Sequence, residues 1–278
     1  MIDQIETIEG SLIQHGPYND RIYVMHLAPG NPDLLIARID QLARSRGYGK
    51  IFAKIPAHCL QPFRTAGYLQ EAQIPGYFSG GESCLFVAKF YQDRQQTSED
   101  FSTLHGLVSQ SSVNQASSAP TEQSFRVERC SPSDAQDLSQ LYQRVFPTYP
   151  FPISDPSYLA CVMERDVSYY GVRSGKIMVA AAAIEPDTSG QAAEMTDFAT
   201  HPTYQGKGLA SLLLQYLHKV IEKSRIKTTY TIARASSYSI NRIFCKHGYT
   251  YAGLLINNTQ ISGRIQSMSV WYKQIASN

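Results

Sequence analysis

The chain has 278 residues, of which 43% are hydrophobic, and a formal net charge of +2. This length suggests one large domain or two ordinary ones, and no run reaches the roughly 18 apolar residues that span a bilayer. Five scattered cysteines without a CxxC pair disfavour a zinc site or a disulfide framework. The acidic start lacks the pattern of a signal peptide. We therefore expect a cytoplasmic protein with reduced thiols and no metal.

Residues 1–94 alternate apolar runs with amphipathic segments, which predicts a small α/β domain. The expected elements are, in chain order, strand 22–27, helix 32–46 closed by Gly47, strand 50–55, helix 58–66 closed by Gly67, and strands near 71–74 and 84–90. Ser, Gln, Thr and Asn dominate residues 95–123, which predicts a flexible linker. The apolar trio Leu104, Leu107 and Val108 could still dock there as one helical turn.

Residues 124–278 predict a second, α+β domain. The expected elements are helices 132–145 and 156–164, a hairpin of strands 167–172 and 176–184, strand 194–200, a helix after Gly208 with a clear apolar stripe, strand 228–233, helix 239–247, and strands 250–256 and 266–273. This part carries 16 basic and 11 acidic residues, a modest excess that suits a polyanionic cofactor. The charge is too scattered for nucleic acid.

The two parts share a local pattern. Phe63–Tyr68 parallels Phe244–Tyr249 at a separation of 181 residues, and similar elements flank both segments. Two interpretations stay open: a degenerate internal repeat, or a connection that is common wherever a helix precedes a strand.

A glycine-rich turn, Gln205-Gly206-Lys207-Gly208-Leu209-Ala210, follows the strand 194–200 and begins the helix with the apolar stripe. Free backbone N–H groups and the helix dipole make such a turn an anion site. Glycine also lets phosphates approach the backbone closely. The short motif alone is weak, because glycine-rich turns begin ordinary helices as well. Dinucleotide-binding and P-loop patterns do not fit its spacing.

In its context the turn resembles motif A of the GNAT acetyltransferases, Q/R-x-x-G-x-G/A. The whole chain apart from the linker is similar to the beta-lysine N-acetyltransferases. The shared blocks are residues 11–16, 19–23, 50–56, 149–153 and 194–200. The resemblance implies a mixed, largely antiparallel central sheet flanked by helices. The repeat between the two parts predicts that a smaller α/β domain resembling half a GNAT fold precedes it. The resemblance also implies transfer from acetyl-CoA to the ε-amine of β-lysine, giving the compatible solute Nε-acetyl-β-lysine.

Residue roles follow from the resemblance. The cofactor would contact the end of the strand and the turn: Phe198, Ala199, Thr200, Gln205, Gly206, Lys207, Gly208, Leu209, Ala210 and Ser211. Glu194 matches the general base of several members, and Asp197 is a second acid that would bind or orient the ammonium group. The competing interpretations are a solvated carboxylate for Glu194 and an ion pair or loop cap for Asp197. A β-bulge, as in relatives, could bring both to one face.

One position departs from the family. Many relatives place a tyrosine, the acid for the leaving thiolate, where this chain has Phe244. Tyr238 could replace it only if the loop folds back, so the thiolate leaves unprotonated or takes a proton from water. Asn241 falls within the helix, and His201 is expected to be structural. Other small amines or a non-catalytic acyl-CoA-sensing role remain alternatives, and the chain could form a homodimer.

Overall fold

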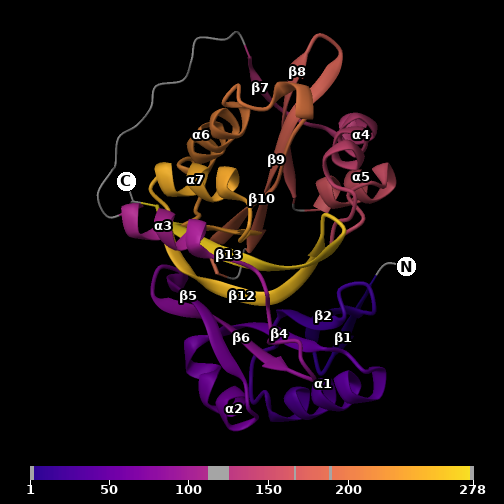
Figure 1. Cartoon of the computed structure of the whole chain (residues 1–278), viewed down its shortest axis with the longest axis vertical. Coiled ribbons are helices and arrows are strands. Elements are labelled where there is room, and N and C mark those ends of the chain that lie inside the picture. The colour runs from indigo at the N-terminus through magenta and orange to yellow at the C-terminus, as the bar shows by residue number, and fades with distance from the viewer. Residues whose placement is uncertain (1–2, 112–124, 166, 188–189, 276–278) are drawn as a thin grey trace.

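The computed structural model describes residues 3–111, 125–165, 167–187 and 190–275. Its strands form one 13-stranded sheet in the order β1-β2-β3-β4-β6-β5-β12-β13-β11-β10-β9-β8-β7. Residues from the two predicted domains therefore share a single sheet, with the N-terminal strands at one end and the C-terminal strands at the other (Figure 1). No helix of the described ranges is long and apolar enough to cross a membrane.

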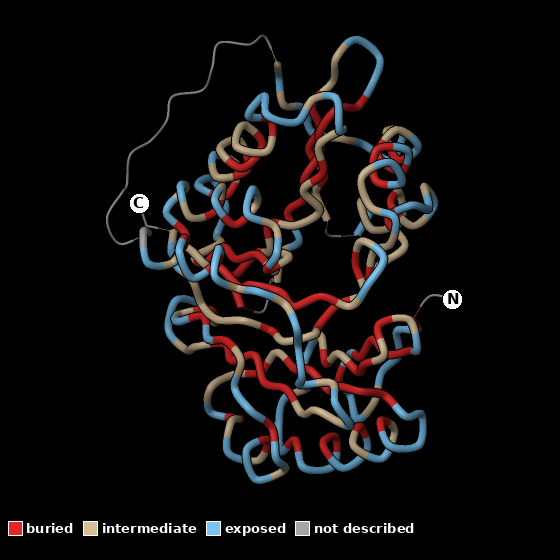
Figure 2. Tube along the Cα trace, in the orientation of Figure 1, coloured by how far each residue is buried: buried red, intermediate tan, exposed pale blue. Residues whose placement is uncertain are grey.

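The first half, residues 3–91, confirms the predicted elements and adds two strands at the start. Its elements are β1 (Gln4–Ile8), β2 (Ser11–Gly16), β3 (Arg21–His26), α1 (Asp33–Arg46), β4 (Lys50–Pro56), α2 (Leu60–Thr65), β5 (Leu69–Phe78) and β6 (Glu82–Phe90). Gly47 ends α1 because it adopts the left-handed conformation, at φ 69°, and its N–H caps the last turn. Helices α1 and α2 expose their outer faces and bury the faces that cover the sheet (Figure 2).

The second half, residues 125–275, also follows the prediction and adds one strand at its start, β7. Its elements are β7 (Val127–Arg129), α4 (Ala135–Val145), α5 (Pro156–Arg165), β8 (Ser168–Ser174), β9 (Ile177–Asp187), β10 (Ala192–Thr200), α6 (Leu209–Ile221), β11 (Thr228–Arg234), α7 (Tyr238–Lys246), β12 (Thr250–Ile261) and β13 (Arg264–Gln274). Helix α6 buries Leu209, Leu213, Leu217 and Ile221, the predicted apolar stripe. Helices α4 and α5 lie on the other side of β9 from α6 (Figure 1).

Part of the segment predicted as a flexible linker is ordered. Residues Ser102–Ser111 form helix α3, which buries Leu104 and Leu107 and packs against α7. Upstream of it, Glu99 accepts a hydrogen bond from the backbone N–H of Ser267 at 2.9 Å. Over residues 102–111 the structure therefore agrees with the alternative of a docked helical turn and not with a flexible linker. The remaining predicted linker, residues 112–123, lies outside the described residues.

The internal repeat is present in the fold. In the first half β3 pairs parallel with β4, β4 antiparallel with β6, and β6 antiparallel with β5. In the second half β10, β11, β13 and β12 pair in the same order and directions. The aromatic rings of Phe63 and Tyr68 meet edge to face at 5.0 Å, and those of Phe244 and Tyr249 do so at 4.9 Å. Shared pairing and shared packing favour a repeat over a chance connection.

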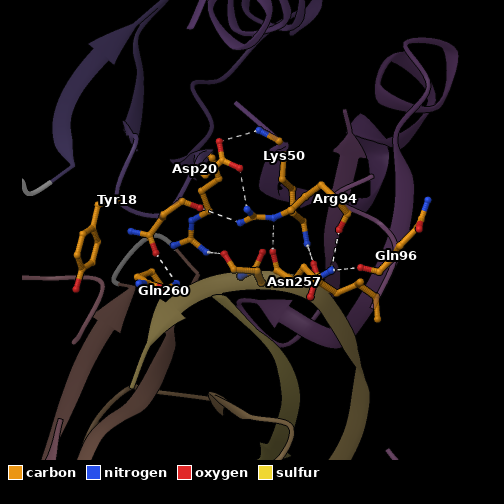
Figure 3. Close-up of polar contacts among 12 residues, drawn as sticks. Tyr18, Asp20, Lys50, Arg94, Gln96, Asn257 and Gln260 are labelled. Atoms are coloured by element: carbon orange, nitrogen blue, oxygen red, sulfur yellow. Dashed lines mark hydrogen bonds and ion pairs between the residues drawn. The ribbon is translucent and has the colours of Figure 1, made fainter. Parts of the chain in front are cut away.

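The halves meet where β5 pairs antiparallel with β12, at Ala72 and Gly253. A cluster of buried side chains spans this junction, with Phe52, Tyr77 and Phe86 from the first half and Tyr230, Met268 and Val270 from the second. Polar side chains of the first half also bind the backbone of β12 (Figure 3). The two halves therefore share one apolar core and one set of hydrogen bonds at their boundary.

Candidate active site

A cavity of about 1200 Å³ lies between the halves. Arg21, Tyr23 and Phe52 line it from the first half, whereas most of its lining residues belong to the second half. The predicted catalytic carboxylates and most of the predicted cofactor residues line this same cavity. The first half therefore contributes directly to the wall of the candidate site.

The glycine-rich turn forms one end of the cavity. Gly206 and Gly208 both take the left-handed conformation, at φ 78° and 76°, and Gly208 is the N-cap of α6. No described atom lies within 4 Å of a Cβ built on Gly208, so the space beside its backbone is open. The N–H groups of the first turn of α6 lack intrahelical partners there. This arrangement provides the dipole and the donors of an anion site.

Eight of the ten predicted cofactor residues line the cavity: Phe198, Thr200, Gln205, Gly206, Gly208, Leu209, Ala210 and Ser211. The other two do not. Ala199, a residue of β10, is buried in a hydrophobic cluster. The Lys207 ammonium lies 4.8 Å from the centroid of the Tyr204 ring. Arg242, Lys246 and Lys273 line the same cavity and had not been predicted as site residues. They add positive charge to its wall.

Strands β10 and β11 separate after a short parallel pairing. Their register runs only from Ala192 opposite Thr228 to Glu194 opposite Tyr230. On its other edge β10 stays paired with β9 as far as Thr200, opposite Ala180. Among the described strands, the edge of β10 that faces β11 is thus unpaired from Met195 onward. An extended ligand could pair with it as a further strand does.

A bulge in β10 brings both predicted carboxylates to the cavity. The register with β9 shifts between Thr196 and Ala199, and Asp197 itself has a positive φ of 56°. In a regular strand, Glu194 and Asp197 would face opposite sides. The extra residue of the bulge removes this difference. Both side chains consequently line the cavity.

Two tyrosine hydroxyls hold Asp197. Tyr149 donates to Oδ1 at 2.6 Å, and Tyr169 donates to Oδ2 at 2.9 Å. Burial raises the pKa of Asp197, while these hydrogen bonds oppose the rise. Tyr149 belongs to the aromatic run at 146–151, so part of that run positions an acid of the site. The predicted alternatives for Asp197, an ion pair or a loop cap, do not match these contacts.

Glu194 is set differently. Burial, and after it the nearby carboxylate of Glu185, raise its pKa, while the Lys54 ammonium and a hydrogen bond from Tyr230 act against the rise; the net pKa is about 8. Lys54 belongs to β4 of the first half, and its Nζ donates to Asp187 Oδ2 at 3.1 Å and to Tyr77 Oη at 3.0 Å. Glu194 is therefore a carboxylate that titrates close to neutral pH.

Glu185 and Lys54 were not predicted as site residues. Glu185 lies opposite Glu194 in the register of β9 and β10, a pairing that the sequence does not display. Lys54 offered a signal, because it is a charged residue with apolar residues on both sides of it in the predicted strand. Its partners, however, come from both halves and could be identified only in the fold.

The residues around α7 agree with the expected departure from the family. Phe244 is fully buried between the rings of Phe198 and Tyr249, so no hydroxyl is available at that position. Tyr238 lies at the start of α7, lines the cavity and is 48% exposed. Asn241 is structural, since its Oδ1 accepts from the Trp271 indole at 2.8 Å. His201 caps a short turn by accepting from the N–H of Thr203, as expected for a structural residue.

Comparisons with known proteins agree with this geometry. The family model described as Acetyltransferase (GNAT) family matches residues 135–249. The Beta-lysine N(6)-acetyltransferase of Methanococcus maripaludis is 33% identical over 98% of this chain and 99% of its own length. N-acetyltransferase YodP of Bacillus subtilis is 30% identical over 95% and 96%, and the Beta-lysine N(6)-acetyltransferase of Methanosarcina mazei is 24% identical over 88% and 98%. With a glycine turn at a helix start, a splayed strand pair and full-length relatives at this identity, the chain belongs to the GNAT family of acetyltransferases.

Proposed function

We propose that the chain transfers the acetyl group of acetyl-CoA to the ε-amine of β-lysine. The observation that carries the proposal is the single cavity that joins an anion-binding helix start to two carboxylates. Two relatives that align along most of this chain are named for this reaction. Members of the GNAT family use acetyl-CoA, and no step of the proposal needs a metal ion.

The pyrophosphate of the cofactor would bind the backbone N–H groups at the start of α6. The open space beside Gly208 supports this placement, because a phosphate needs room where other residues carry a Cβ. The pantetheine arm would pair with the free edge of β10 at Phe198–Thr200. The thioester would then lie near the bulge that carries Asp197.

The amine must lose a proton before it can attack. An alkylammonium has a pKa of about 10.4, so the neutral form is disfavoured by about 4.6 kcal/mol at pH 7. A carboxylate with a pKa close to neutrality is suited to accept this proton. Glu194 meets that requirement, with a pKa of about 8. The two oxygens of Asp197 each accept a hydrogen bond from a tyrosine hydroxyl, so Asp197 is better suited to hold and orient the ammonium group.

The reaction then balances as follows. The ammonium first gives one proton to Glu194, directly or through one water. The neutral nitrogen then forms a bond to the thioester carbonyl carbon and loses its second proton to water. The carbon–sulfur bond breaks, and the CoA thiolate leaves. Since Phe244 offers no hydroxyl, the thiolate takes a proton from water or leaves unprotonated. β-Lysine carries one net positive charge and its Nε-acetyl product none, which suits a solute that accumulates to high concentration in the cytoplasm.

A thiol-release assay tests the proposal. With acetyl-CoA fixed, β-lysine should give a higher kcat/KM than α-lysine, ornithine and putrescine. A higher kcat/KM for another amine would transfer the proposal to that amine. Binding of acetyl-CoA without turnover of any amine would instead support a non-catalytic acyl-CoA-sensing role.

A further inference from the structure

A second polar site lines the cavity where the halves meet. Arg21 of β3 is 3% exposed, and its Nη1 donates to the backbone oxygen of Asn258 and, at 2.9 Å, to Thr259 Oγ1. Arg21 Nε has no hydrogen-bond partner in the structure. Among the described residues, no ion pair within 4.0 Å is found for this guanidinium. It is therefore a buried cation with an unused donor beside the substrate cavity.

Asn258 of β12 complements Arg21. It is 2% exposed, its Nδ2 donates to Thr259 Oγ1 at 3.3 Å, and its Oδ1 accepts no hydrogen bond in the structure. Both Asn258 and Thr259 line the cavity with Arg21. Buried polar atoms without partners are rare and costly in folded proteins. One cavity is thus lined by a residue with an unpartnered cationic donor and by a residue with an unpartnered neutral acceptor, which suggests a ligand that carries both a carboxylate and an ammonium group.

The first half fixes the stretch of β12 that carries Asn258. The register with β13 is interrupted between Leu255 and Thr259. Over this stretch, side chains of the first half bind the exposed backbone: Glu71 accepts from the Ile256 N–H at 2.7 Å, Lys50 donates to the Ile256 carbonyl at 2.7 Å, and Arg94 donates to the Asn257 carbonyl at 2.9 Å. Asn257 in turn donates to the backbone of Arg94 and Gln96 (Figure 3).

The same network leaves the Asn258 Oδ1 atom without a hydrogen-bond partner. On its far side, Asn19 accepts from the Gln260 N–H at 2.9 Å. Every contact of this set fixes the backbone on either side of Asn258 without using its Oδ1. Preorganisation of this kind lowers the entropy that a ligand loses on binding.

We propose that Arg21 and Asn258 bind the amino-acid end of the amine substrate, with Arg21 Nε donating to the carboxylate and Asn258 Oδ1 accepting from the β-ammonium. This inference rests on the proposed function, since it gives a binding site to the end of the substrate opposite the ε-amine, which itself lies near Glu194 and Asp197. The first half of the chain thereby contributes to substrate specificity. A polyamine would place a second ammonium against the Arg21 guanidinium, and this repulsion would exclude it.

Three amine substrates allow the contacts of Arg21 and Asn258 to be measured separately. β-Lysine carries both groups, ε-aminocaproate lacks the β-amine, and hexylamine lacks the carboxylate as well. In Arg21→Met, the ratio of kcat/KM for ε-aminocaproate over hexylamine should fall about tenfold or more, because a charged hydrogen bond is lost. In Asn258→Leu that ratio should hold, while the ratio for β-lysine over ε-aminocaproate should fall about fivefold or more.

Arg94→Met is the matched control. Arg94 also binds the β12 backbone, but it is not part of the cavity wall. Unchanged ratios in Arg94→Met, with acetyl-CoA affinity retained in all three variants, would support a direct role for Arg21. Equal changes in Arg94→Met and Arg21→Met would overturn it in favour of a structural role.

Asn258→Leu keeps the inference open to test if Arg21→Met does not fold. Wild-type selectivity for β-lysine over ε-aminocaproate that survives in Asn258→Leu would contradict the subsite. Failure of the wild-type protein to prefer β-lysine over α-lysine or putrescine would instead contradict the proposed function. The two failures are thus distinguishable in one set of assays.

Discussion

Ala72 and Gly253 lie opposite each other where β5 meets β12, and they occupy equivalent places in the two halves, 181 residues apart in the sequence. Equivalent strands that pair antiparallel are related as in a two-fold symmetric dimer. The chain therefore has the plan of two similar subunits fused into one. Only the second half carries the glycine turn, while the first half contributes Arg21 and Lys54.

Gly253→Ala should disrupt this junction. Gly253 has φ 149°, and an added Cβ would lie 2.2 Å from the Glu71 carbonyl oxygen and 2.6 Å from the Ala72 Cα. Backbone atoms cannot move aside cheaply, so we expect a loss of about 2 kcal/mol or more in unfolding free energy. Denaturant unfolding measures it. Gly30→Ala, at φ 111° with open space around it, controls for backbone strain and should cost less.

Glu194→Gln should lower kcat about a hundredfold or more, because the amide cannot accept the proton of the ammonium. Acetyl-CoA affinity, measured by calorimetry, should not change. Activity should partly return at high pH, where more of the amine is already neutral. Full activity of Glu194→Gln at pH 7, together with an inactive Asp197→Asn, would exchange the roles of the two carboxylates.

Two substitutions should move the pH profile in opposite directions. The Glu185 charge raises the pKa of Glu194 and the Lys54 charge lowers it. Since the deprotonated base is the active form, kcat/KM should rise with pH around the Glu194 pKa of about 8. Glu185→Gln should shift this rise to lower pH and Lys54→Met to higher pH.

Lys89→Met provides the control for these profiles. Lys89 pairs with Asp40 in the first half and is not part of the cavity wall. Its loss removes one positive charge, as Lys54→Met does, but should leave the pH profile in place. Shifts of equal size in both variants would point to net charge rather than to Lys54 itself.

Gly208→Val should weaken acetyl-CoA binding at least about tenfold, or about 1.4 kcal/mol, because the side chain occupies the space of a phosphate. Isothermal calorimetry measures it. Gly175→Val is a matched control, since Gly175 also has a positive φ, at 60°, with open space around it, but lies in the turn between β8 and β9 and is not part of the cavity wall. Equal acetyl-CoA affinity in the Gly208→Val and wild-type proteins would remove the turn from the cofactor site.

Much of the fold could be predicted because local patterns determine it. The apolar stripe of α6 and the glycines that end α1 and follow α7 act within a few residues. Strands β1 and β2 were missed because they lack a marked alternation of apolar residues. Helix α3 lies in a polar segment, and its apolar residues indicated no more than one docked turn. The helix packs against α7, which lies far along the chain, so its full length could not be predicted locally.

The residues of the site also differ in whether local sequence could identify them. Glu194, Asp197 and the glycine turn lie within one segment, so a motif could identify them. Lys54, Glu185 and Arg21 reach the cavity through strand register and through the junction of the halves. No spacing in the sequence encodes those distances. Residues of a second structural unit that bind the substrate or shift the pKa of a catalytic group can be identified only after the fold is known.

The pairing of β5 with β12 also determines which strands end the sheet. β12 has a neighbour on both sides, and the two edges of the described sheet are β1 and β7. β7 spans three residues, and β1 is largely exposed and carries Glu6. Short or charged edges resist pairing with another molecule. A homodimer would therefore have to form through helices or loops, since β12 is no longer free to extend the sheet into a second copy.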